Sequence, residues 1–218
     1  MRTITVKGVG KVSVKPDLIV ISMRMETTNK DYEKTMEYAA ERIGLIGSEL
    51  ERIGFAKDDL KTTSFNVQTD YKSVKDEKGN YKSVFMGYVC KHGLQVCFDF
   101  DTKRLGQVLS TISSCYAMPE FSVSFSVKDP TAISSELLQS AATNAKSKAE
   151  ILCAASGVQL GELESINYSW SEIDVYSHSE YALAADCMPK VGASIANMDI
   201  EPEDINVSDS ATFVWEIK

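Results

Sequence analysis

The chain has 218 residues, and a chain of this length buries roughly 70% of its unfolded surface without help from metals or disulfides. Acidic residues number 31 against 23 lysines and arginines, so the net charge of -8 repels phosphate backbones and anionic lipid surfaces. We therefore expect no nucleic-acid partner. No basic-then-apolar leader and no run of about 18 apolar residues is present, which predicts neither an export signal nor a membrane span.

The cysteines are odd in number and form no Cys-x-x-Cys pair: Cys90, Cys97, Cys115, Cys153 and Cys187. A chain large enough to need no covalent staple, with scattered thiols, is typical of a reducing compartment, and we expect a cytoplasmic protein. The only histidines are His92 and His178, and only His92 lies near a cysteine in the sequence. Zinc prefers clustered thiolates and imidazoles, so we expect no metal site and no other cofactor.

The N-terminal segment predicts two paired strands, residues 3–14 and 18–25, which meet at a turn around Pro16 and Asp17. Gly8 and Gly10 lie inside the first strand pattern and indicate a bulge or a close approach of backbone. They do not resemble a phosphate-binding loop, because no third glycine follows and no helix begins there.

From Asp31 the apolar period changes from two to about 3.6, which predicts a long amphipathic helix packed against a sheet. Asn29 or Asp31 can cap its start, and Gly54 supplies the left-handed residue that ends it. A coiled-coil seam is the alternative, but the segment is short for one and is flanked by predicted strands.

Strands at 63–73 and 81–98 are predicted to form a hairpin across a polar loop at 76–80. In the second strand, one face carries Tyr88, Cys90, His92, Leu94, Val96 and Phe98, and Gly93 permits a bend. A helix capped by Asp101 follows.

Strict alternation at 121–127 predicts a half-buried strand, and Asp129 and Pro130 then open a helix that runs to Ser156 and stops at Gly157. Small residues on its apolar stripe permit close approach to a sheet. Strands are predicted at 163–175 and 205–217, with a long loop at about 176–201 between them. The expected fold is α+β, with mixed or antiparallel sheets packed against long helices in the order β-β-α-β-β-α-β-α-β-β.

An ordered series of short motifs runs along nearly the whole chain and resembles the SIMPL domain family. It starts with 5–10 and Pro16-Asp17, continues through Gly54-Phe55 and 59–62, and includes Asp129-Pro130, Gly157-Val158 and the closing strand. Pro202-Glu203 stands where the family usually has Pro-Gly before that strand. The resemblance implies a single SIMPL-like domain over 1–218, made of two intertwined halves, about 1–100 and 101–218. It also implies self-association and a link to stress defence, without agreed catalytic residues.

Two side-chain groupings suggest chemistry, and both have simpler explanations. Cys90 and His92 share a strand face and are conceivable as a nucleophile and base, but a third orienting group is missing and buried cysteine is common. Carboxylates at Asp58-Asp59 and around Pro202 lie at element ends, where turn and capping roles are typical. We therefore predict no catalytic residue.

An aromatic cluster, Tyr168, Trp170, Tyr176 and Tyr181, runs from the predicted strand at 163–175 into the long loop, and residues 168–181 contain no lysine or arginine, which disfavours nucleic-acid stacking. Side chains of this kind anchor protein interfaces, although a loop that folds over its own core would look the same. The predicted interaction surface consists of Trp170, Tyr176, Tyr181, Met188 and Met198.

The sequence favours a non-enzymatic protein that assembles into a homo-oligomer, with a further protein partner also conceivable. A second hypothesis is a binding module that captures a small ligand or a partner peptide at an exposed sheet edge. A third is a cysteine-dependent redox enzyme or sensor, which is disfavoured because no resolving thiol is evident.

Overall fold

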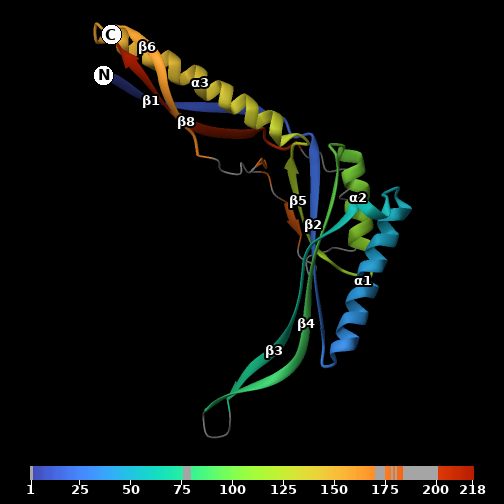
Figure 1. Cartoon of the computed structure of the whole chain (residues 1–218). Coiled ribbons are helices and arrows are strands. Elements are labelled where there is room, and N and C mark those ends of the chain that lie inside the picture. Colours follow the sequence, from blue (N-terminus) through green and yellow to red (C-terminus); the bar gives the residue numbers. More distant parts are fainter. Residues whose placement is uncertain (1, 76–79, 170–174, 178, 180, 184–200) are drawn as a thin grey trace. The chain divides into compact units, whose positions relative to one another are not determined.

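The computed structural model of the chain describes residues 2–75, 80–169, 175–177, 179, 181–183 and 201–218 (Figure 1). Its helices are α1 (Tyr32–Arg52), α2 (Thr102–Ser114) and α3 (Pro130–Ala155), with a short 3-10 turn at Lys57–Asp59. Its strands are β1 (Thr3–Val14), β2 (Leu18–Asn29), β3 (Leu60–Lys75), β4 (Tyr81–Asp99), β5 (Glu120–Ser126), β6 (Leu160–Asn167), β7 (Tyr181–Leu183) and β8 (Ile205–Ile217). The predicted α+β class and the predicted order of elements are confirmed, with β7 as an addition.

The chain divides into two compact units whose segments alternate along the sequence. The first contains 1–17, 126–178 and 202–218, and the second contains 18–125 and 179–201. The predicted halves at 1–100 and 101–218 follow a different division and stay a prediction about domains.

The first unit is a three-stranded antiparallel sheet in the order β1-β8-β6, with α3 packed along it. Strand β1 pairs with β8 over its full length, from Thr3 opposite Glu216 to Val14 opposite Ile205. Apolar side chains from both strands and from α3 form its core: Val6, Val12, Leu137, Ala145, Ala149, Phe213 and Trp215. Burial of this surface explains the alternation seen in 3–14 and 205–217.

Gly8 and Gly10 bring β1 directly against α3, as the close-approach prediction requires. A side chain at Gly8 would overlap the carbonyl oxygen of Ala141, and its Cβ would come within 2.8 Å of the Ala145 Cβ. A side chain at Gly10 would overlap the carbonyl oxygen of Leu137. Ala141 and Ala145 of α3 face this contact and are fully buried, so small residues on both elements set the distance between them.

The predicted pairing of the first two strands is wrong. Strand β2 pairs with β4, from Leu18 opposite Asp99 to Asn29 opposite Tyr88, while β1 pairs with β8. Between them, Asp17 donates its N–H to the Ser126 carbonyl at 3.1 Å and accepts the Lys128 N–H on its carboxylate at 2.8 Å. The two strands leave this point for different sheets, because their apolar side chains belong to different hydrophobic cores.

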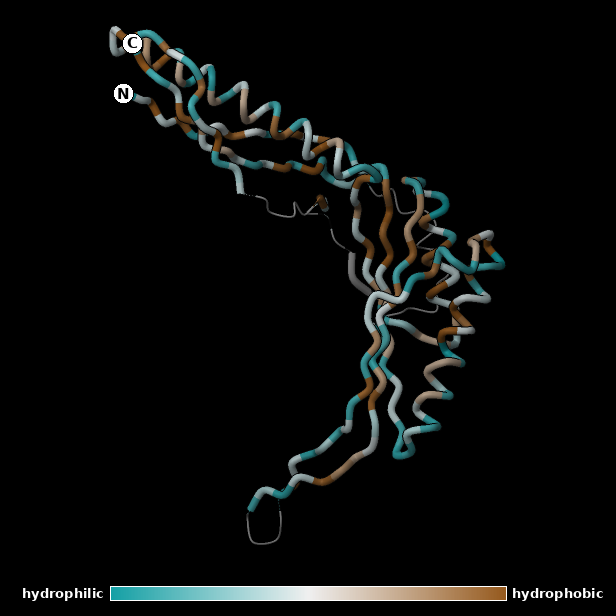
Figure 2. The backbone as a smooth tube through the Cα atoms, viewed as in Figure 1, coloured by the Kyte–Doolittle hydropathy of each residue, from teal (hydrophilic) through white to brown (hydrophobic). Residues whose placement is uncertain are grey.

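The second unit is a five-stranded antiparallel sheet in the order β3-β4-β2-β5-β7, and Figure 1 shows α1 and α2 on one side of it. Figure 2 shows hydrophobic stretches along the strands beside these helices. The core combines Ile46 and Leu50 of α1, Leu105 and Ile112 of α2, and strand residues that include Ile21, Met23, Leu94, Val96, Val123 and Phe125.

The helix ends are as the sequence predicts. Asp31, Asp101 and Asp129 each accept backbone N–H groups of the following first turn on their carboxylates. Gly54 and Gly157 have positive φ angles of 90° and 70° just beyond α1 and α3.

The β3–β4 hairpin is confirmed, whereas the strand predicted at 163–175 is placed differently. It forms as β6, which begins at Leu160 and ends at Asn167 after two irregularities in its pairing with β8. Within the predicted loop at 176–201, Tyr181–Leu183 forms β7 and pairs with β5. Most of that loop lies outside the described residues.

Candidate interaction surface

The structure describes only some of the predicted interaction residues. Trp170, Met188 and Met198 lie outside the described residues, and of Tyr181 only the backbone pairing with Val123 is described. Tyr176 is exposed and forms an isolated bridge with Ser126. Whether these side chains gather on one surface stays a prediction.

Cys90 and His92 face the core of the second unit and are 1% and 6% exposed. The His92 Nε2 and the Thr62 Oγ1 form a 3.0 Å hydrogen bond, and the Phe65 ring meets the imidazole edge to face. Nδ1 is buried without a hydrogen-bonding partner among the residues described. The imidazole is thus held by a hydroxyl and an aromatic ring rather than by a thiol and a carboxylate.

Burial favours the neutral forms of both side chains. It lowers the pKa of His92 and raises the pKa of the Cys90 thiol. A neutral buried thiol is a poor nucleophile, because the thiolate is the reactive species. This environment is typical of packed core residues.

The other described cysteines are also free thiols. Cys115 and Cys153 are buried and Cys97 is exposed, on the strand face opposite Cys90 as predicted. Desolvation nevertheless raises the pKa of the Cys97 thiol, which reduces its thiolate fraction at neutral pH. Cys187 lies outside the described residues.

Across the described part of the chain, no group of three or more potential metal ligands occurs.

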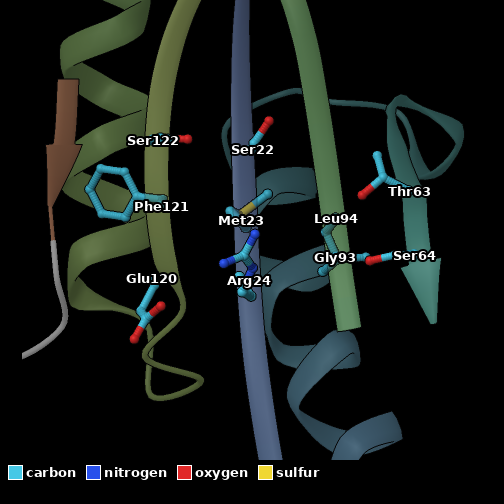
Figure 3. A pocket seen from close by; sticks show the side chains of 10 residues that line it. All are labelled: Ser22, Met23, Arg24, Thr63, Ser64, Gly93, Leu94, Glu120, Phe121 and Ser122. Carbon is cyan, nitrogen blue, oxygen red and sulfur yellow. The ribbon is translucent and has the colours of Figure 1, made fainter. Parts of the chain in front are cut away.

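A polar groove of about 510 Å³ lies over β2, β4 and β5 on the sheet face away from the helices (Figure 3). Arg24 lies at the centre of the groove. Ser22 and Ser122 lie on the same face of the sheet as Arg24, and Glu120 lies at the rim of the groove. The Thr63 and Ser64 hydroxyls border Gly93, where the β3–β4 pairing shifts register. The groove offers a cation, a carboxylate and several hydroxyls to a small polar molecule.

Among the described residues, a large set of exposed apolar side chains belongs to the far part of the β3–β4 hairpin, residues 71–75 and 81–86, which we call the distal arm. It begins at a register shift between Asp70 and Tyr71, opposite Gly87 with its φ of 141°. Figure 1 shows this hairpin extending past the helices that cover the rest of the sheet. Its large apolar residues are all exposed, up to 75% for Tyr81: Tyr71, Val74, Tyr81, Val84, Phe85 and Met86.

Both faces of the distal arm combine apolar and basic or hydroxyl groups. One face carries the opposed pairs Tyr71 with Phe85, Ser73 with Ser83, and Lys75 with Tyr81. The other carries Lys72 with Val84 and Val74 with Lys82. The Tyr71 and Phe85 rings meet edge to face at 5.5 Å, and Phe85 continues to Tyr88 at the same distance. This arrangement is typical of a surface that binds a partner.

Sequence reasoning placed this hairpin but missed its exposure. A signal was present, because Tyr-Lys-Ser-Val occurs at 71–74 and again at 81–84. The repeat gives both strands of the arm the same mixture of aromatic, basic and aliphatic side chains. Neither copy shows the clean apolar and polar alternation of a strand with one buried face.

Helix α1 carries a second unfilled feature, a groove of about 370 Å³ that we call the α1 groove. Its walls are Ile43, Leu50, Ala56 and Leu60, and its floor includes Gly44 and Gly47. A side chain at Gly44 would meet no other atom within 4 Å, and one at Gly47 would only touch the end of Leu60 at 4.0 Å. Glycine inside a helix costs about 1 kcal/mol relative to alanine, and packing against the described residues explains neither glycine.

The fold and these surfaces place the chain among α+β proteins with a long, exposed β-hairpin. The SIMPL family model, described as "Protein of unknown function (DUF541)", matches residues 4–215, and the chain belongs to this family. No helix among the described residues is long and apolar enough to cross a membrane.

Curated relatives are similar over most of the chain. "Uncharacterized protein YggE" of Edwardsiella ictaluri is 23% identical over 98% of this chain and 86% of its own length. The "26 kDa periplasmic immunogenic protein" of Brucella melitensis is 25% identical over 75% of this chain and 65% of its own. "Uncharacterized protein YggE" of Escherichia coli is 25% identical over 76% and 65%. The chain thus aligns with slightly under two thirds of the Brucella and Escherichia proteins.

Proposed function

We propose that the protein is a non-enzymatic component that assembles into a homo-oligomer. The distal arm carries this proposal. A two-stranded ribbon with apolar side chains exposed on both faces is marginally stable in water, and burial of each Å² of its apolar surface stabilises by about 25 cal/mol. An assembly that covers the arm supplies that stabilisation.

The proposed absence of catalysis is supported by the chemistry around His92. Its imidazole is bound to the Thr62 hydroxyl and kept neutral by burial, and the nearby Cys90 thiol has a raised pKa. These are the properties of structural side chains. A cysteine-dependent redox role has the same difficulty at Cys97, whose thiol also has a raised pKa.

Light scattering coupled to size-exclusion chromatography tests the assembly. We expect the wild-type mass to exceed that of one chain between about 1 and 100 μM, a range in which micromolar contacts are populated. Replacing Tyr81 and Phe85 by serine should lower that mass. Tyr116→Ser, which removes a tyrosine that is 94% exposed outside the arm, should leave it unchanged. A wild-type protein that stays monomeric over the whole range contradicts the proposal.

The cellular setting is also a proposal. The described cysteines are free thiols, which supports a reducing, cytoplasmic compartment, whereas the Brucella relative carries the word periplasmic in its name. Fractionation of native cells with compartment markers decides between the two.

The link to stress defence rests on the family resemblance, and survival of a deletion strain under peroxide, with and without the intact gene, tests it.

A binding module is the second candidate, and the polar groove over β2, β4 and β5 favours it. Arg24 and Glu120 offer charges of both signs, so a small zwitterionic molecule suits the groove better than an apolar one. Native mass spectrometry of the purified protein should then show a retained small molecule. Its loss in Arg24→Gln, with the mass of the assembly unchanged, would support this function.

A further inference from the structure

The distal arm is basic although the chain as a whole is acidic. Residues 71–86 contain four lysines, one aspartate and one glutamate, a formal charge of +2, whereas the whole chain carries -8. In the described part of the arm, Lys72, Lys75 and Lys82 are exposed and none of them forms an ion pair with a described residue. A second copy of this acidic chain therefore attracts the arm.

The helix that carries the α1 groove has the complementary charge, with five glutamates against three lysines and arginines. Gly44 and Gly47 of the groove lie on a helical stripe with residues spaced three or four apart: Glu33, Glu37, Ala40, Gly44, Gly47 and Glu51. The three glutamates are exposed at the two ends of the stripe, and small residues occupy its centre. The lining of the groove itself carries one acid, Glu51, and one base, Lys57, so the acidic charge of the stripe comes from Glu33 and Glu37, which lie beyond the groove.

The shapes also agree. A strand or hairpin can lie close to a helix only where side chains are short, and Gly44 and Gly47 open the helix surface at this place. The half-buried side chains of Ile43 and Leu60 match the valines and aromatic rings of the arm, whereas Leu50 belongs to the core of the second unit. Contacts among the described residues fill neither surface, and a second copy that presents the arm to the groove explains both.

We propose that the distal arm of one copy docks in the α1 groove of a second copy. This inference rests on the proposed self-assembly and names the surfaces that would carry it. The contact joins two different patches, so it propagates head to tail and gives a closed ring if the rotation between copies closes, or an open filament if it does not. The alternative occupant of a basic aromatic arm is an anionic membrane, and the experiment includes it.

Charge reversal provides a test with internal rescue. One variant carries Lys72→Glu, Lys75→Glu and Lys82→Glu on the arm, and the other carries Glu33→Lys, Glu37→Lys and Glu51→Lys on the helix. In each variant alone, like charges face each other across the contact. We therefore expect the protein concentration at which half of the variant is assembled to be at least about tenfold higher than for the wild type. An equimolar mixture pairs opposite charges at every contact, and we expect it to regain the wild-type mass in analytical ultracentrifugation.

Substitution of the two glycines provides a second test, because folding stability should rise while assembly weakens. Gly44→Ala and Gly47→Ala favour the helix, and each should raise the Tm of the dissociated protein by roughly 2 °C. The added methyl groups should nevertheless weaken assembly by about tenfold, because they fill the floor of the groove. Leu45→Ala, which alters an exposed apolar side chain of α1 outside the groove, should leave the mass unchanged.

The outcomes separate this inference from the proposed function. If the wild type assembles and both charge variants keep its mass, the arm and the groove are not the contact, while self-assembly stands. If the wild type is a monomer throughout, both proposals fail. If the arm variant keeps its mass but loses binding to phosphatidylserine vesicles that the wild type binds, the arm recognises a membrane and the docking proposal is wrong.

Discussion

At the scale of residues, Gly8 and Gly10 decide how closely a helix lies on a strand. Their hydrogens face the Ala141 and Leu137 carbonyl oxygens of α3 at distances that no side chain allows. The sequence indicated a bulge or a close approach and left the choice open, because glycine suits both. The partner element completes the explanation, since α3 presents alanines to the same contact.

Gly10→Ala should destabilise the protein by about 1–3 kcal/mol, because the new methyl group forces β1 away from α3. Urea denaturation followed by circular dichroism measures the change. Ser13→Ala, at an exposed position of the same strand, is the matched control and should shift stability by less than about 0.5 kcal/mol. Equal effects of the two substitutions would contradict the close contact.

His92 should make stability depend on pH. Burial lowers its pKa in the folded protein, so the unfolded chain binds a proton more readily. The free energy of unfolding should therefore fall as the pH drops below the unfolded value of about 6.5. We expect this loss to be smaller in His92→Gln when urea midpoints are compared at about pH 7.5 and about pH 5.5. An identical pH dependence in both proteins would show that His92 titrates normally.

At the scale of elements, Arg42 joins α1 to two other parts of the second unit. Its Nε and Nη2 donate to the Ala117 carbonyl at 3.1 and 2.7 Å. Its Nη1 donates to the Glu26 carbonyl at 2.6 Å and to the Thr27 hydroxyl at 3.0 Å. The guanidinium thereby fixes the helix to β2 and to the turn before β5.

Arg42→Ala should lower the free energy of unfolding by about 2–3 kcal/mol, because it leaves several acceptors without their donor. Arg52→Ala is the control, since its ion pair with Glu49 lies at the surface and contributes at most about 1 kcal/mol. Thermal or urea unfolding of the two variants measures the difference. Similar losses would mean that Arg42 acts as an ordinary surface residue.

The elements themselves were largely predictable, and their pairing was not. The 3.6-residue period of α1 and the alternation of β5 follow from which side chains each element buries, and the sequence records that directly. The sequence does not show which strand is the hydrogen-bonded neighbour. The alternation of β1 would be the same if it paired with β2 or with β8, and its partner depends on which core each strand faces. The exposure of the distal arm was missed for the same reason, because only the fold shows where the covering helices stop.

At the scale of the whole molecule, the contrast between a basic arm and an acidic chain predicts salt-sensitive assembly. Raising the salt concentration from about 0.1 to about 1 M shortens the screening length from about 10 to about 3 Å. The wild-type oligomer should then dissociate in light scattering at a fixed protein concentration. Assembly that strengthens with salt would indicate purely apolar contacts and would count against the charges on α1.

The pairing of β1 with β8 has a consequence for biosynthesis. These strands come from opposite ends of the described chain, and Ile217 donates its backbone N–H to the Arg2 carbonyl. Strand β8 supplies Phe213 and Trp215 to the core, so the first unit lacks its central strand until residues 205–217 have been synthesised. Residues 18–125, in contrast, emerge as one continuous stretch and can begin folding on the ribosome, before the strand β8 that pairs with β1 has been synthesised.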